Sequence, residues 1–193
     1  DDALIYLGVH RGVKAGSYNA QLNGGLPTPG SAIKYGPETL WSYESGFKLS
    51  LADDKVKLNG SVYYYDYKGY QSFLFTGVAG LVVNADARTY GGELSVQANP
   101  YPGLDLSASV SAYSSSYYYN LRNFSADKFS GYVLVNLGLS WVSDSGVELG
   151  VGVDNLTDKR IGVQGFDLAT LCGCNEVSYR TPRTFFVRSR YSF

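Results

Sequence analysis

The sequence contains no methionine, one histidine and two cysteines among its 193 residues. It also lacks any apolar run near the roughly 18–20 residues that a membrane-spanning helix requires. The formal net charge is −1, so no basic field indicates a nucleic-acid partner. The chain begins at Asp1, without an initiator methionine or the basic and apolar regions of a leader peptide. We interpret it as a mature product or as a fragment of a longer protein.

The few residues suited to catalysis or metal binding form no recognisable site. Cys172 and Cys174 are one residue apart, and two thiols cannot supply the four ligands of a structural zinc ion. They could form a local disulfide in an oxidising envelope, although so small a ring would be strained, and their redox state stays open. His10 would need a carboxylate and a nucleophile beside it to act as a catalytic base, and neither can be placed there from the sequence. We therefore expect no enzymatic activity, no cofactor and no metal site.

Tyrosine and glycine are abundant instead, with 18 and 23 residues, a bias that favours strands and tight turns. Apolar and polar residues alternate with the two-residue period of a strand, and no stretch shows the period of a helix. The eight alternating segments are 4–9, 40–51, 56–67, 88–98, 104–117, about 132–141, 147–154 and 184–193. The last segment places four apolar residues on one face: Phe185, Val187, Tyr191 and Phe193.

The connections between these segments alternate in length. Short turns lie at 52–55, 99–103 and 143–146, and long stretches at 15–36, 68–87, 118–131 and 156–182. Within 68–87, two apolar patches at 73–75 and 81–83 could form a small hairpin of their own. In an antiparallel meander every short turn falls on one side, which is the asymmetry of outer-membrane barrels with short periplasmic turns. A β-sandwich has no reason to sort its loops in this way. The sequence thus predicts an all-β antiparallel meander of about eight transmembrane strands, with a periplasmic C-terminus.

This arrangement assigns a face to each alternating residue. The charged residues expected to face the lumen are Glu44, Lys48, Lys57, Glu93, Glu148, Asp154, Arg188 and Arg190. Aromatic residues are expected at both membrane interfaces. The periplasmic set is Tyr101, Trp141, Tyr191 and Phe193, and the outer set is Tyr64, Tyr90, Tyr117 and Tyr132. If the last two strands pair, Glu148 and Arg190 lie at similar depth, as in a ladder of ion pairs.

Four stretches together resemble the C-terminal part of the barrel of TonB-dependent outer-membrane receptors. They are Leu4-Ile5-Tyr6 followed by residues 11–16 and Asn19; Pro37-Glu38 with Trp41, Tyr43-Glu44, Gly46 and Lys48; Asp154-Asn155-Leu156-Thr157-Asp158-Lys159-Arg160; and the terminal Phe193. The resemblance implies a 22-stranded barrel with an N-terminal plug and a TonB-binding motif, both absent here. Residues 1–193 would then be one C-terminal barrel segment, about a third of the wall. Tyr191 and Phe193 would belong to the assembly signal, although Arg188 stands where a glycine is common.

The same resemblance implies a function and a set of partners. The expected function is uptake of a scarce nutrient across a bacterial outer membrane, with a ferric siderophore as the expected ligand. The expected partners are outer-membrane lipid, the insertion machinery, TonB through the absent plug, and a small nutrient such as an iron chelate. Arginines and tyrosines at an external mouth suit anionic or aromatic chelates. The candidate contacts are Tyr117, Tyr118, Tyr119, Lys159, Arg160, Arg180 and Arg183; the alternative is an aromatic girdle with ordinary solvated charges.

Two other functions remain open at this stage. The first is a free-standing eight-stranded barrel that serves as an anchor, adhesin or small channel. Side chains must fill the interior of so narrow a barrel, and the many serines and glycines on the lumen side speak against it. The second is a secreted β-sandwich that binds glycans through its tyrosines.

Overall fold

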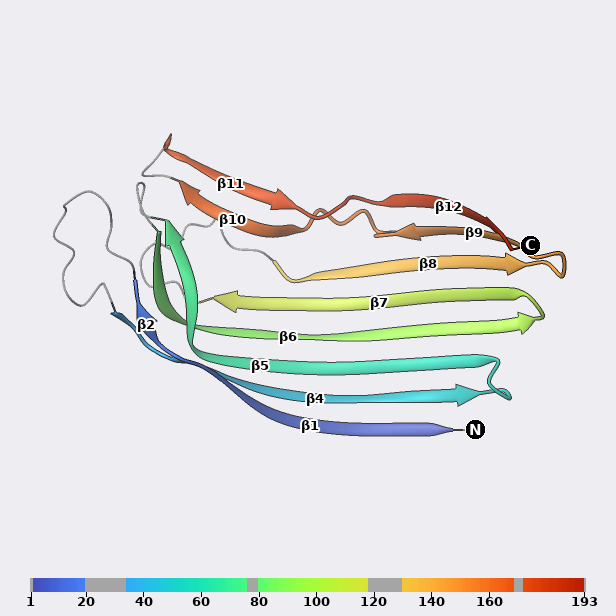
Figure 1. Cartoon of the computed structure of the whole chain (residues 1–193), viewed down its shortest axis with the longest axis horizontal. Helices are drawn as coiled ribbons and strands as arrows, with labels where there is room; N and C mark the ends of the chain where they lie inside the picture. Colours follow the sequence, from blue (N-terminus) through green and yellow to red (C-terminus); the bar gives the residue numbers. More distant parts are fainter. Residues whose placement is uncertain (1, 20–33, 76–79, 118–129, 169–171, 193) are drawn as a thin grey trace.

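One large antiparallel sheet dominates the computed structural model, which describes residues 2–19, 34–75, 80–117, 130–168 and 172–192 (Figure 1). Eight strands form it in the order β1-β4-β5-β6-β7-β8-β9-β12. Their bounds are β1 Ala3–Lys14, β4 Glu38–Leu51, β5 Val56–Phe75, β6 Gly80–Tyr101, β7 Leu104–Tyr117, β8 Tyr132–Val142, β9 Val147–Asp154 and β12 Thr184–Tyr191. Two small pairs lie outside it, β2 Ser17–Tyr18 with β3 Lys34–Tyr35, and β10 Gly162–Leu168 with β11 Cys174–Tyr179. The predicted meander of about eight strands is confirmed.

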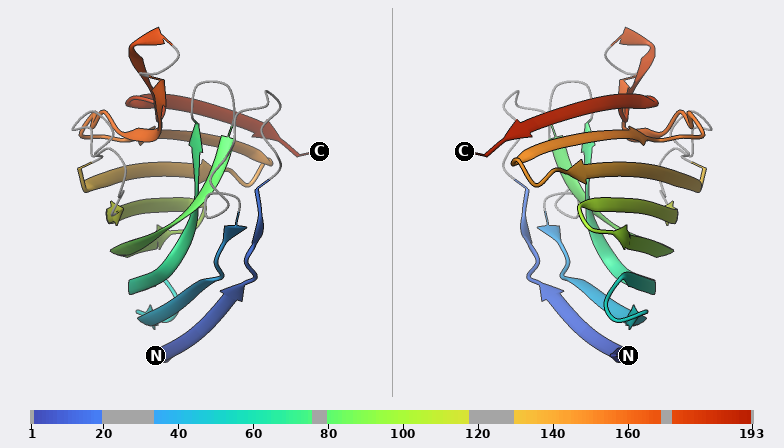
Figure 2. Two further views of the ribbon diagram at one scale, coloured as in Figure 1. Left: turned by 90° about the vertical axis from the view of Figure 1, so that its left-hand side faces the viewer. Right: turned by 90° about the vertical axis from the view of Figure 1, so that its right-hand side faces the viewer.

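The large sheet is open. Its two edges are β1 and β12, and Figure 2 shows the sheet curved, with the two chain ends at opposite margins. The described strands therefore do not close into an eight-stranded barrel of their own. Among the described residues no helix is long and apolar enough to span a membrane.

The two faces of the sheet differ as the alternation predicts. On the apolar face, Ile5, Leu7 and Val187 are 79%, 80% and 82% exposed. Among the described residues only four hydrophobic side chains are buried: Ala87, Leu134, Val153 and Ile161. A sandwich would cover this face with a second sheet, so the glycan-binding sandwich is wrong. A largely exposed apolar face is one that lipid, rather than water, would cover.

Aromatic residues mark both ends of the apolar face. Toward the long connections, here called the loop end, Tyr43 pairs with Tyr64 and Tyr64 with Tyr90 across three strands. Toward the short turns, the turn end, Tyr101 and Trp141 are exposed. These rows confirm four of the predicted interface residues: Tyr64, Tyr90, Tyr101 and Trp141. Tyr132 is a correction, because its ring lies 5.2 Å from that of Tyr113. Tyr113 belongs to the polar face, so the predicted outer girdle does not include Tyr132. Tyr117 is a second correction, because it pairs with Ala87, a residue of the polar face.

The predicted loop 68–87 is largely strand. β5 and β6 continue past the membrane-width segment and pair to their ends, with Phe73 opposite Val82 and Phe75 opposite Gly80. The alternation breaks between Tyr67 and Tyr70, where the register shifts and Gly69 takes a φ of +64°. An extra residue in one strand bends it and reverses its parity. The apolar patches do pair as expected, but as extensions of two long strands instead of a separate hairpin.

The last predicted loop also contains a hairpin, β10 with β11, before β12 returns along β9. In that return Arg190 lies opposite Glu148, at the predicted depth. The ion pair forms diagonally instead, between the Arg188 guanidinium and the Glu148 carboxylate at 3.1 Å. Phe193, the expected terminal anchor, lies outside the described residues, whereas Tyr191 is 63% exposed on the apolar face.

Candidate functional site

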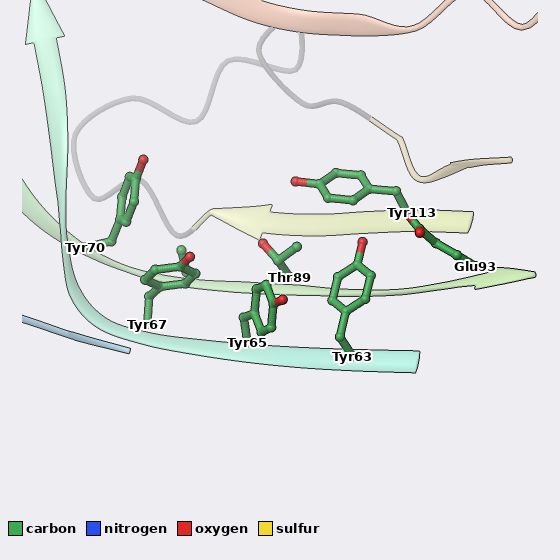
Figure 3. A pocket seen from close by; sticks show the side chains of 8 residues that line it. Tyr63, Tyr65, Tyr67, Tyr70, Thr89, Glu93 and Tyr113 are labelled. Atoms are coloured by element: carbon green, nitrogen blue, oxygen red, sulfur yellow. The ribbon is translucent and has the colours of Figure 1, made fainter. Parts of the chain in front are cut away.

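A cavity of about 440 Å³ lies on the polar face near the loop end. Figure 3 shows its lining, in which tyrosines from β5 point toward side chains of β6 and β7. The lining residues are Tyr63, Tyr65, Tyr67, Tyr70, Ala87, Thr89, Glu93 and Tyr113. We call this set the tyrosine pocket. The i, i+2 spacing of Tyr63, Tyr65 and Tyr67 places all three on one face of a strand, and this spacing is the signal by which the sequence could have indicated the pocket.

Contacts between neighbouring rings hold the pocket tyrosines. The rings of Tyr63 and Tyr65 lie 5.0 Å apart. The rings of Tyr67 and Tyr70 lie 5.4 Å apart, nearly edge to face, because the register shift returns Tyr70 to the pocket. Such aromatic pairs add about 0.5–1.5 kcal/mol beyond the area they bury. The wall is therefore a set of tyrosine rings that support one another in pairs.

Two carboxylates, those of Glu44 and Glu93, lie next to the tyrosine rings. The Tyr65 hydroxyl donates a hydrogen bond of 2.8 Å to Glu44, and the hydroxyl of the buried Ser42 donates one of 3.2 Å to the same carboxylate oxygen. Glu93 lines the cavity directly. The lining contains no lysine, arginine or histidine. The pocket thus offers aromatic faces and hydroxyl groups to a ligand, together with one negative charge.

The basic residues predicted at the external mouth gather at the base of the β10–β11 hairpin. The Arg160 guanidinium lies 3.9 Å from the centre of the Tyr179 ring, and the Arg180 backbone amide donates to the Ile161 carbonyl at 2.8 Å. Arg183 is 3.8 Å from the Asp158 carboxylate. β10 also contacts β5, the strand that carries half of the pocket lining. The hairpin base and the tyrosine pocket thus belong to the same end of the sheet.

The remaining predicted contacts are placed less completely. Lys159 donates its backbone amide to the Asn155 side chain at 2.9 Å, so its backbone is fixed. Tyr117 is the last residue of β7, opposite Ala87. Tyr118 and Tyr119 lie outside the described residues. Whether any member of the predicted set touches a ligand stays a prediction.

The Asp154–Arg160 stretch has a structural reason for its composition. Asn155 is buried and has a φ of +53°, a conformation that asparagine tolerates better than most residues. Its side chain accepts from the Lys159 amide and donates to the Lys159 carbonyl at 3.0 Å. Its own amide donates to the Asn136 side chain at 2.9 Å. One asparagine therefore closes the turn and ties it to β8.

Gly46 in the Trp41–Lys48 stretch is explained by a close approach. A Cβ at Gly46 would lie 2.5 Å from the Tyr6 hydroxyl oxygen and 2.6 Å from the Gly60 carbonyl oxygen. Tyr6 comes from β1, so the first and second resembling stretches meet across the β1–β4 pair. The tyrosine ring occupies the space that a glycine leaves.

The cysteines form a disulfide between Cys172 and Cys174, with their Cα atoms 5.2 Å apart. Of the two states that the sequence left open, the structure has the oxidised one. Both are exposed at the start of β11. Across the described residues, no cluster of three or more histidine, cysteine or acidic side chains could hold a metal ion.

Beyond the aromatic row at the loop end, Asp86 fixes the β5–β6 bend. Its carboxylate accepts a hydrogen bond from the Gly69 amide at 3.0 Å and from the Lys68 ammonium at 3.2 Å. The Gly69 amide, and after it the Lys68 ammonium, lower the pKa of Asp86 below its ordinary value. A carboxylate with a lowered folded pKa stabilises the fold above its ordinary pKa, and this stabilisation is lost as the pH falls through the folded pKa.

We therefore expect the Gly69 amide to lose its protection from hydrogen exchange when Asp86 is protonated. The effect will be small and local because the Asp86 side chain is 52% exposed. The measurement is exchange at Gly69 in the wild type and in Asp86→Asn at matched pH. The two should differ near neutral pH and converge in acid; an equal difference at all pH values would contradict this origin of the protection.

Comparisons with known proteins cover the whole chain. Residues 1–123 match the family described as "TonB dependent receptor-like, beta-barrel". The ferric yersiniabactin uptake receptor FyuA from Yersinia pestis has a similar fold, with a TM-score of 0.59 and 20% identity over 100% of this chain and 35% of that one. The copper transporter OprC aligns with a TM-score of 0.52 and 19% identity over 99% of this chain and 37% of that one. The chain thus spans about a third of the length of these two structures.

Proposed function

The chain belongs to the TonB dependent receptor-like β-barrel family of outer-membrane receptors, and we propose that it forms about a third of the wall of a receptor that imports a ferric chelate. Residues 1–193 would be a single segment of that barrel, with the loop end extracellular and the turn end periplasmic. The open edges of β1 and β12 would pair with strands of the remaining wall. The plug that opens in response to TonB would occupy the polar face. The family consists of receptors and transporters. We assign no catalytic role to the residues of this chain.

The observation that carries the choice of ligand is the chemistry of the loop end. The tyrosine pocket presents aromatic faces and hydroxyl groups, and the hairpin base presents Lys159, Arg160, Arg180 and Arg183 on the same end of the sheet. Guanidinium groups bind carboxylates and other oxyanions through charge-assisted hydrogen bonds, and tyrosine rings stack on planar aromatic groups. An anionic chelate with aromatic iron-binding groups, such as a ferric siderophore, satisfies both. The structural similarity to FyuA, at 20% identity, supports the fold alone. The choice of ligand is therefore argued from the pocket and hairpin residues.

The test is iron uptake by the full-length receptor in a bacterial strain that lacks other ferric-chelate receptors. A panel of radiolabelled ferric chelates should include anionic catecholates, uncharged hydroxamates and a copper chelate. We expect concentration-dependent uptake of an anionic aromatic ferric chelate. The proposed ligand would be refuted if the receptor took up none of the ferric chelates, or took up only the copper chelate.

Removing two charges from the hairpin base should weaken capture. We expect the Arg160→Ala, Arg180→Ala double variant to raise the half-saturating concentration for uptake roughly tenfold, because a hydrogen bond to a charged group contributes about 1.5–3 kcal/mol and solvent screens exposed charges. Arg190→Ala removes one charge at the turn end and serves as the control. An unchanged half-saturating concentration in the double variant would exclude the hairpin base from the binding site.

A further inference from the structure

Charged residues gather on the apolar face just beyond the aromatic row of the loop end. The row formed by Val9, Tyr43, Tyr64 and Tyr90 is followed, two residues further along each strand, by Arg11, Trp41, Asp66 and Arg88 in register. The next step outward carries Lys68 and Asp86. We call Arg11, Trp41, Asp66, Lys68, Asp86 and Arg88 the rim cluster. Alternation places it on the same face as the membrane-facing side chains, at the height where lipid headgroups begin.

Ion pairs hold part of the rim cluster in place. Asp66 lies 3.5 Å from the Arg88 guanidinium and 3.8 Å from the Lys68 ammonium, and Lys68 is also 3.2 Å from Asp86. The side chains of Lys68 and Arg88 remain 53% and 48% exposed. Both cations therefore keep a solvent-facing side that a ligand can reach.

Arg11 differs from the other two cations. Its guanidinium lies 5.7 Å from the centre of the Trp41 ring, and no ion pair to it exists in the part of the chain that the structure describes. The Trp41 side chain is 39% exposed. A guanidinium over an indole is stabilised by the aromatic face of the ring. At the top of an aromatic girdle, its hydrogen-bond donors can extend toward the headgroup layer.

The net charge of the rim cluster favours an anion. Three cations, Arg11, Lys68 and Arg88, exceed the two carboxylates by one charge. At the opposite membrane boundary the short turns carry Asp53, Asp54, Lys55 and Asp144, which sum to −2. The rim cluster at the loop end and the short turns at the turn end thus carry net charges of opposite sign.

We propose that the rim cluster binds the phosphorylated sugar headgroup of an outer-leaflet glycolipid. Arg11 and Arg88 are separated by three strand spacings, which is roughly 14 Å at about 4.8 Å per strand, so they suit a headgroup that carries two separated phosphates. Trp41 lies between them in the register and supplies an amphipathic ring at the boundary between sugar and acyl chain. This proposal rests on the outer-membrane location and not on the identity of the transported nutrient.

The test uses the full-length receptor purified in detergent and titrated with bisphosphorylated lipid A, followed by native mass spectrometry. Its matched ligands are monophosphoryl lipid A and phosphatidylglycerol. We expect the bisphosphorylated glycolipid to remain bound at the lowest concentration. Removal of Arg11 or Arg88 should weaken its binding about fivefold for each cation, the effect of one basic residue near an anionic lipid surface.

Three variants separate binding from structural support. Arg11→Ala removes a cation whose only described contact is an aromatic ring. Asp66→Asn removes a negative charge and should strengthen binding, whereas a purely structural role for the ion pairs predicts weaker binding. Lys55→Ala removes a charge from the opposite boundary and should change nothing. Equal binding by the wild type and the Arg11→Ala, Arg88→Ala double variant would overturn the proposal, and so would equal affinity for phosphatidylglycerol.

Discussion

Replacing Leu94 by arginine is expected to remove most of the folded receptor from the outer membrane. Leu94 lies on the apolar face of β6, is 48% exposed and stands between Tyr90 and Tyr101, which mark the two aromatic rows. Arginine at the middle of the lipid-facing surface of a barrel costs about 2–4 kcal/mol. A cost of that size lowers the folding equilibrium by roughly 30-fold to 1,000-fold.

Ser95→Arg is the matched control because Ser95 is the next residue of the same strand and has the opposite parity. Its side chain accepts a hydrogen bond from Asn59 at 3.5 Å on the polar face. Both variants add the same charge at the same depth, so a difference between them reports only which face meets lipid. The readout is the fraction of full-length receptor that migrates as a compact species before heating. Equal loss in both variants would contradict the assignment of the two faces.

Strict alternation made the membrane-width part of the sheet predictable. In β8, apolar residues at every second position, Val133 to Trp141, define one face without ambiguity. Any slip of one residue would exchange the two faces, so the pattern also determines the register. The tight turns predicted that successive strands run antiparallel, because connections of four or five residues are too short to join parallel strands.

The loop-end structure could not be predicted in the same way. Tyr67, Lys68, Gly69 and Tyr70 interrupt the alternation, and a sequence-based reading ends the strand there. Pairing with β6 resumes beyond the bulge through Tyr70 and Ala85, a tertiary contact without a local signal. The tyrosine pocket depends on this event, because the bulge brings Tyr70 back to the face that carries Tyr67.

Ion pairs showed a second limit of register-based reasoning. Pairing predicts Glu148 with Arg190, and their Cα atoms are indeed opposite. A long guanidinium reaches its diagonal neighbours as easily as its direct partner, and Arg188 makes the contact. The face and depth of a charged residue follow from alternation, whereas the choice between two arginines on one strand depends on rotamers.

Gly146, the glycine of the β8–β9 turn, contacts the backbone at the end of the C-terminal strand. Gly146 has a φ of +82°, and its carbonyl accepts a hydrogen bond from the Ser192 amide at 3.0 Å. A Cβ at Gly146 would collide with the Ser192 carbonyl oxygen, which belongs to the backbone and cannot rotate away. Gly146→Val is therefore expected to destabilise the folded barrel by roughly 2–5 kcal/mol, from a left-handed backbone cost of about 1–2 kcal/mol and an overpacking cost of about 1–3 kcal/mol.

The Gly146→Val substitution should also impair assembly of the barrel. Ser192, which its Cβ would displace, directly follows β12 and precedes the terminal aromatic residue. Displacing it would separate β12 from β9 at the end where Tyr191 pairs with Val147. Asp144→Val places the same side chain in the same turn at an exposed position and should assemble normally. Gly146→Asn tolerates a positive φ better but keeps the colliding Cβ, so we expect an intermediate yield of compact receptor in the membrane fraction. If Gly146→Val and Asp144→Val gave the same yield, the backbone contact between the turn and the C-terminal strand would have no part in assembly.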